Sequence, residues 1–150
     1  MNRLIFVNRY GPPDHSATSQ ILGDLASHLA ARGNDVYIVT SNQLYGEPGA
    51  QLAREEIIAG VKIKRVSGTR YGRSGLAGRA LDYLSFYANS RALLAEIARS
   101  GDVIVAETDP PLLSVALAGV AARRGAKLVN WLQDIFPEIA IEPESAATPR

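Results

Sequence analysis

The chain has 150 residues, no cysteine and a formal net charge of +1. This length suits one domain with its own core, and a content of 47% hydrophobic and 21% charged residues is typical of a globular protein. The near-neutral charge gives no basic field for nucleic acid, and the lack of cysteine excludes disulfides and thiolate metal sites. The longest apolar stretch, at 112–122, is too short to span a bilayer, so we expect a soluble, cytoplasmic domain.

The amino-terminal part predicts a strand, a helix and a second strand. The apolar run at 3–8 and the stretch DVYIVT at 35–40 predict buried strands. Between them, 16–32 repeats apolar side chains at helical spacing, and Gly33 is a suitable helix stop. We expect a parallel, right-handed β-α-β unit. The expected core face of the helix consists of Ile21, Leu22, Leu25 and Leu29.

The middle of the chain gives a weaker pattern. Residues 41–60 show no clear period and predict a long loop, whereas VKIKRV at 61–66 alternates as a half-exposed edge strand does. The glycines and arginines of 68–78 predict a basic loop. A long helix is expected over about 76–99, with a core face of Leu81, Leu84 and Ala88.

The last part predicts two more strands, at 102–106 and 126–132, separated by a helix. Pro110 and Pro111 favour the start of that helix, with Asp109 as its N-cap. The end of the chain, 142–150, predicts an unstructured tail. Strands interleaved with helices indicate an α/β fold, with a doubly wound, mainly parallel, Rossmann-like sheet in one domain over 1–141.

Ligands of such sheets bind beyond the carboxyl ends of the strands, so the segments that follow the strands are the candidate sites. In the first, Ser16 begins a helix and either caps it or lets a phosphate approach its N-terminus. The glycine triplet of a dinucleotide fingerprint is missing from this loop. His15 and His28 stand 13 residues apart, without acidic residues at the spacing of a metal site, so no metal is expected.

The other segments carry carboxyl and amide groups. Glu107 either accepts a hydrogen bond from a ligand or stands at the dipole of the following helix. Asp134 either takes a proton from a sugar hydroxyl or forms a local turn, and the turn is the commoner role for a lone aspartate. Gln133 can both donate to and accept from a sugar hydroxyl.

Three stretches, in this order, resemble the amino-terminal domain of family 4 retaining glycosyltransferases, which have the GT-B fold. They are LAARGNDV at 29–36, VAETDPPLLSVALAG at 105–119 and LVNWLQDIFPEIA at 128–140. The last is similar to a motif of the subgroup that builds surface polysaccharides. This sequence departs from the family in having Ser16-Ala17 where many members have Gly-Gly, and Gln133 where many have histidine.

The resemblance implies the acceptor-side half of a GT-B enzyme, which transfers a sugar from a nucleotide-sugar donor to a sugar or polyprenyl-diphosphate-linked acceptor. It implies no metal and no cofactor. The donor would bind mainly to a carboxyl-terminal domain that this sequence lacks, so the chain by itself is expected to be inactive. The implied site residues are Glu107 and Asp134 for catalysis, Ser16, Ala17 and Gln133 for the donor, and Thr18 and Glu138 for the acceptor.

Four residues on one face of the expected long helix are further candidates for binding the acceptor. Arg79, Tyr83, Tyr87 and Arg91 recur every four residues, so they share one face. They predict either a grip on a lipid diphosphate or an ordinary solvated face. With Arg65, Arg70 and Arg73 nearby, a peripheral contact with the inner face of a membrane is a further expectation. Apolar surface at the expected domain interface would also favour a homodimer.

Two other readings stay open. The first is a stand-alone doubly wound ligand-binding or signalling domain without catalytic activity. A signalling receiver needs acidic residues after its first strand, and the residues there are Asn8 and Arg9. The second is a dinucleotide-dependent oxidoreductase, which needs the absent glycines and an acidic residue where Thr40 and Ser41 stand.

Overall fold

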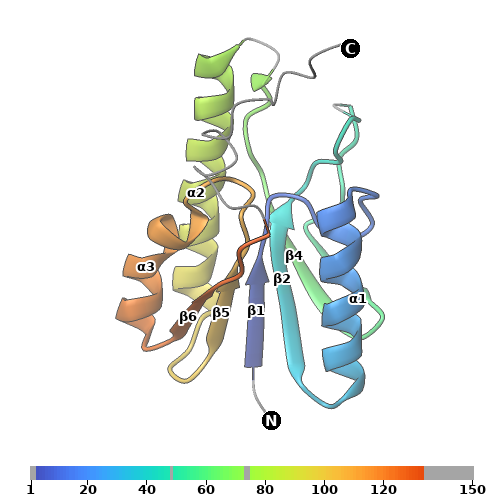
Figure 1. Cartoon of the computed structure of the whole chain (residues 1–150), viewed down its shortest axis with the longest axis vertical. Helices are drawn as coiled ribbons and strands as arrows, with labels where there is room; N and C mark the ends of the chain where they lie inside the picture. Colours follow the sequence, from blue (N-terminus) through green and yellow to red (C-terminus); the bar gives the residue numbers. More distant parts are fainter. Residues whose placement is uncertain (1–2, 48, 73–74, 134–150) are drawn as a thin grey trace, which may run out of the picture.

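The computed structural model describes residues 3–47, 49–72 and 75–133 of the chain. Six strands form one sheet in the order β3-β4-β2-β1-β5-β6 (Figure 1), with β3 antiparallel to β4 and every other pairing parallel. The strands are β1 (Arg3–Val7), β2 (Asp35–Ser41), β3 (Glu55–Ile58), β4 (Val61–Val66), β5 (Val103–Ala106) and β6 (Lys127–Asn130). The helices are α1 (Ala17–Ala31), α2 (Leu76–Ile97) and α3 (Leu113–Arg124).

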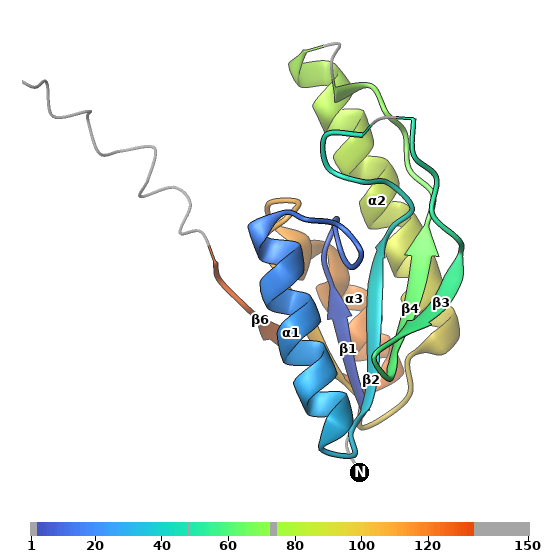
Figure 2. The same ribbon diagram turned by 90° about the vertical axis from the view of Figure 1, so that its right-hand side faces the viewer.

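Both faces of the sheet are covered, which confirms the predicted Rossmann-like α/β fold. In Figure 2, α1 lies on one side of the sheet and α2 and α3 lie on the other. Phe86 of α2 and Leu117 of α3 are buried in one core, against Ile5 and Ile104 of the sheet. Leu22 of α1 is buried in the other core. None of the helices in the described part of the chain is long and apolar enough to cross a membrane.

The predicted β-α-β unit is confirmed, but only half of the residues predicted for the core face of its helix pack against the core. β1 pairs in parallel with β2, and Gly33 follows α1 with a φ of +87°. Leu22 is fully buried and Leu29 packs against the same core. Ile21 and Leu25 are exposed instead, because α1 turns Ser19, Leu22 and Ala26 toward the sheet.

The strand at 61–66 is not the edge of the sheet, as the alternation had predicted. β4 lies between β2 and an additional strand, β3, which the sequence pattern missed. The hairpin joins Ile58 to Val61 through Ala59 and Gly60, whose φ angles are both positive, at 48° and 81°. Such two-residue turns usually carry asparagine, aspartate or glycine first, so an alanine there gives no signal.

The predicted core face of α2 is also wrong. Leu81 and Leu84 are 51% and 60% exposed, and the buried row contains Asp82 and Phe86. Asp82 accepts hydrogen bonds from the Thr69 hydroxyl at 2.7 Å and from the Tyr71 amide at 2.8 Å, so its burial is compensated. These bonds fasten the loop before α2 onto the helix itself.

The third helix begins later than predicted. Its N-cap position is Leu112, in the left-handed conformation with a φ of +61°, and Asp109 does not cap it. Residues 107–111 instead form an irregular segment of bends, and the Asp109 carbonyl in it accepts a hydrogen bond from the Arg9 amide at 2.8 Å. This segment belongs to the carboxyl edge of the sheet.

Candidate carboxyl-edge site

Backbone hydrogen bonds join the segments that follow β1, β5 and β6. The Glu107 amide donates to the Val7 carbonyl at 3.1 Å, and the Trp131 amide donates to the Ala106 carbonyl at 2.8 Å. Together with the bond from Arg9 to Asp109, they hold three strand ends at one place. In a parallel sheet this is where ligands bind, and we call it the carboxyl-edge site.

Glu107 is the central residue of this site. Only 1% of it is exposed, and its Oε2 atom accepts a hydrogen bond from Gln133 Nε2 at 3.1 Å. No described residue bonds to its other oxygen, Oε1. Burial, followed by the charge of Asp109, raises the pKa of Glu107 to about 8, against a smaller lowering by Gln133. At neutral pH the group is therefore mostly a neutral acid, which suits a hydrogen-bond donor better than a base.

A pocket of about 240 Å³ opens beside Glu107. Glu107 lines it together with the start of α3 and the end of β6. The other lining residues are Thr108, Pro111, Leu112, Leu113, Ser114, Val115, Asn130 and Leu132. The pocket thus combines an apolar wall with a few hydrogen-bonding groups, which is the usual composition of a small-ligand site.

Arg9 is a member of the site that sequence reasoning missed. Its guanidinium lies over the Tyr83 ring at 5.3 Å and over the Tyr10 ring at 5.2 Å, and Nη2 is 3.7 Å from Asp82 Oδ2. A single arginine directly after the first strand was the available signal, but the sequence shows only Tyr10 beside it and gives no sign of Tyr83. The cation is thereby held in place at the carboxyl edge.

Of the four residues that share one face of α2, two lie at the carboxyl-edge site and two lie in solvent. Tyr83 contacts Arg9, and the Tyr87 hydroxyl donates a hydrogen bond to the Pro111 carbonyl. Arg79 and Arg91 are exposed. The structure therefore brings the two tyrosines to the carboxyl edge and leaves the two arginines at the surface of the helix.

One of the three basic residues expected to face a membrane is not accessible. The Arg65 side chain is completely buried. It donates to the Pro12 carbonyl at 2.8 Å and the Ala53 carbonyl at 2.9 Å, and it pairs with Glu56 at 2.8 Å. Its charge is satisfied inside the protein, so it cannot serve a lipid surface. Arg73 lies outside the described residues.

The residues expected to bind the donor do not form one group. Ser16 is the N-cap residue of α1, but its hydroxyl makes no capping bond, and Asp14 Oδ1 accepts the Ser16 amide at 2.8 Å instead. Ser16 lines a separate pocket of about 200 Å³ with Asp14 and Tyr45. Ala17 is exposed and Thr18 is half-buried in the first turn. The buried Asp14 carboxylate makes this helix end unfavourable for a phosphate.

Gln133, the third expected donor residue, lies with Glu107 as described above. Asp134 and Glu138 lie outside the described residues. Within the described part of the chain, no group of three or more acidic or histidine side chains could hold a metal ion.

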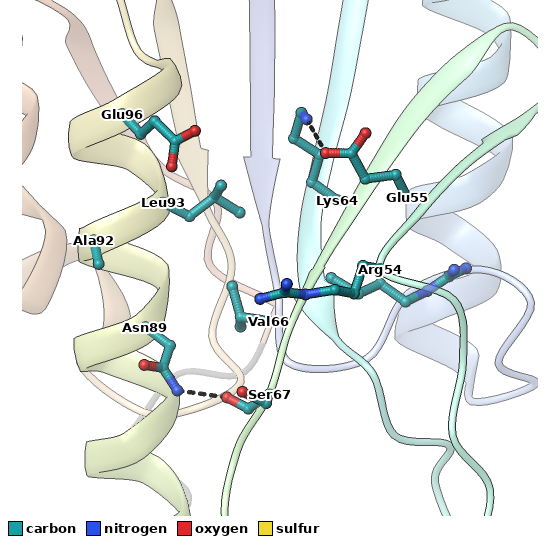
Figure 3. A pocket seen from close by; sticks show the side chains of 10 residues that line it. Arg54, Glu55, Lys64, Val66, Ser67, Asn89, Ala92, Leu93 and Glu96 are labelled. Carbon is teal, nitrogen blue, oxygen red and sulfur yellow. Dashed lines mark hydrogen bonds and ion pairs between the residues drawn. The ribbon is translucent and has the colours of Figure 1, made fainter.

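A larger pocket, of about 480 Å³, lies elsewhere, between α2 and the strands β3 and β4 (Figure 3). Two pairs of its hydrogen-bonding groups already bond to each other. Lys64 Nζ bonds to Glu55 Oε1 at 2.6 Å, and Asn89 Nδ2 donates to the Ser67 carbonyl at 2.6 Å. No buried polar group without a partner lies among its lining residues except Arg65 Nε. The sequence did not indicate this groove, and its chemistry does not point to a ligand.

Comparison with known proteins adds no assignment. No protein-family model matches the chain, and no curated protein matches its sequence.

Proposed function

We propose that this chain is the acceptor-side domain of a GT-B glycosyltransferase, which moves a sugar from a nucleotide-sugar donor to a sugar or polyprenyl-diphosphate-linked acceptor. The observation that carries the proposal is the buried Glu107–Gln133 pair beside a pocket at the carboxyl edge. An acid and an amide together offer both donors and acceptors, which is what the hydroxyls of a sugar require. Two of the three stretches that resemble the family contain this pair, Glu107 in 105–119 and Gln133 in 128–140.

Each residue has a part in the proposed reaction. The acceptor hydroxyl forms a bond to the anomeric carbon of the donor sugar while the bond from that carbon to the leaving diphosphate breaks. The hydroxyl gives up its proton, and Asp134 is the proposed base. Glu107, because it is mostly neutral at pH 7, orients the acceptor by hydrogen bonding and does not act as the base.

Arg9 is the proposed contact for the diphosphate of a lipid-linked acceptor. Tyr83 and Tyr10 hold its guanidinium in place, and a positioned arginine binds a phosphate with good geometry. The half-buried rings of Tyr83 and Tyr87 offer apolar surface for the first part of the lipid.

Titration of the ¹⁵N-labelled chain, followed by NMR, tests the proposal. A short polyprenyl diphosphate is expected to shift the amides of Arg9 and Tyr83, while uridine diphosphate glucose and a nicotinamide dinucleotide are not. Arg9→Gln should weaken binding of the diphosphate about tenfold or more, because a charged hydrogen bond is lost. Arg123→Gln, at an exposed residue near the end of α3, is the matched control. Tight binding of the dinucleotide would favour the oxidoreductase instead.

A further inference from the structure

The pocket beside Glu107 has an exposed apolar wall made by three side chains. Leu112 is 74% exposed, Val115 is 70% exposed and Leu132 is 60% exposed, and all three line the pocket. They come from the start of α3 and from the segment after β6. Large apolar side chains that border a hollow together offer a place for an apolar group of a ligand.

Glu107 lines the same pocket and carries a buried polar atom without a described partner. Its Oε2 atom already accepts the hydrogen bond from Gln133, so the proton of the neutral acid belongs on Oε1. No described residue accepts a hydrogen bond from that oxygen. Buried polar atoms in native proteins nearly always have a partner, so Oε1 indicates a ligand atom that accepts a hydrogen bond.

The charges around the pocket select a neutral ligand group. The lining residues include no lysine, arginine or histidine in the described part of the chain. The titratable groups that act on this place are Asp109, on the same segment as Glu107, and Tyr87 of α2, whose hydroxyl donates to the Pro111 carbonyl. Burial raises the pKa of Tyr87, so this phenol stays neutral. The lining therefore supplies no cation for an anionic group of a ligand.

We propose that this pocket binds the acetamido group of an N-acetylated sugar, with Glu107 donating a hydrogen bond to the acetamido carbonyl oxygen. The acetamido methyl packs against Leu112, Val115 and Leu132. This inference rests on the proposed function, because it names the acceptor sugar that the carboxyl-edge site selects. The amide carbonyl is the acceptor that Oε1 needs, and the methyl is the apolar group that the wall fits.

The experiment measures binding of two simple sugars to the purified chain by NMR titration. They are methyl N-acetylglucosaminide and methyl glucoside, which differ by the acetamido group. At pH 6.5 the first should bind about tenfold more tightly, because it satisfies both the buried acid and the apolar wall. Its addition should shift the amides of Leu112 and Val115. Equal binding of the two sugars would overturn the inference.

Deprotonation of Glu107 supplies a second readout. At pH 9.5 the wild-type chain should lose its preference for the N-acetylated sugar, since a carboxylate cannot donate a hydrogen bond. Glu107→Gln should keep the preference at both pH values, because an amide donates at both. A preference in the wild type that does not change between these pH values would contradict the role of Glu107.

The apolar wall is tested separately. Val115→Ser should reduce the preference severalfold and leave the fold intact, because the side chain is exposed. Leu84→Ser, at an exposed position of α2 outside the pocket, is the control and should change nothing. If a polyprenyl diphosphate binds but the two sugars bind equally, this inference fails and the proposed function stands. If the N-acetylated sugar is preferred but no polyprenyl diphosphate binds, the pocket chemistry stands and the function needs revision.

Discussion

Asp14 and Glu107 are two buried acidic residues that follow strand ends of the same sheet, but their carboxyl groups differ in how many hydrogen bonds they accept. Both oxygens of Asp14 accept backbone hydrogen bonds, from Ser16 at 2.8 Å and from Tyr45 at 2.6 Å. Glu107 has one side-chain partner and one open oxygen beside a pocket. Asp14 therefore stabilises the fold, whereas Glu107 is available to a ligand. The buried fraction of the two side chains alone would not have distinguished these two roles.

The pH dependence of stability gives the largest expected difference. The folded-state pKa of Glu107 is raised to about 8, so the folded chain holds a proton that the unfolded chain releases near the ordinary value of 4.5. Stability from this group is therefore fully present below about pH 4.5 and is lost as pH rises toward 8. The upper bound is about 1.4 kcal/mol per pH unit, or roughly 4 kcal/mol between pH 5 and pH 8.

Urea denaturation of the wild type and of Glu107→Gln at several pH values measures this effect. The variant has no titrating group at this position, so its free energy of unfolding should fall less steeply over the same range. Parallel curves for the two proteins would mean that Glu107 is ionised in the folded state, and the contrast with Asp14 would disappear.

Removal of the Asp14 side chain should change the free energy of unfolding somewhat less than the titration of Glu107 does. Asp14→Ala leaves the amides of Ser16 and Tyr45 without their acceptor, for which we expect a loss of about 3 kcal/mol in the free energy of unfolding. Asp14→Asn keeps one acceptor oxygen and should lose less. Thermal or urea unfolding checks both variants, and a loss below that of a typical surface substitution would show that Asp14 is not structural.

The smallest effect is expected at Ser16. Because its hydroxyl makes no capping bond, Ser16→Ala should change the free energy of unfolding by less than about 0.5 kcal/mol. A loss of 1 kcal/mol or more in the same denaturation experiment would show that serine does cap α1 in solution.

Local sequence patterns predicted those parts of the fold that depend on local order. The apolar runs located β1, β2 and β5, because strands inside a sheet that is covered on both faces are apolar. The run at 126–132 located β6, although this end strand is largely exposed. The core face of α2 was wrong because its buried row contains Asp82, whose partners Thr69, Tyr71 and Arg9 are distant in the chain. A buried charge is recognisable only when its partners are known.

The site was predicted in outline and not in its contacts. The segments after the strands located Glu107 and Gln133, since the carboxyl ends of parallel strands share one edge. Their hydrogen bond joins residues 26 positions apart, and neither the burial of Glu107 nor its raised pKa follows from the sequence. Arg9 was overlooked for the same reason, because its contact with Tyr83 of α2 does not follow from the sequence.

The strand β3 has a practical consequence for anyone who purifies this protein. It is an end strand of the sheet, and Ile57 on it is exposed, so a second molecule could extend the sheet there. Glu55 and Glu56 put two negative charges on this short strand, and Lys64 lowers the pKa of Glu55 through a hydrogen bond. The Glu55 charge, which discourages strand-to-strand aggregation, therefore persists into mildly acidic buffers. Below that range we expect the protein to become prone to precipitation.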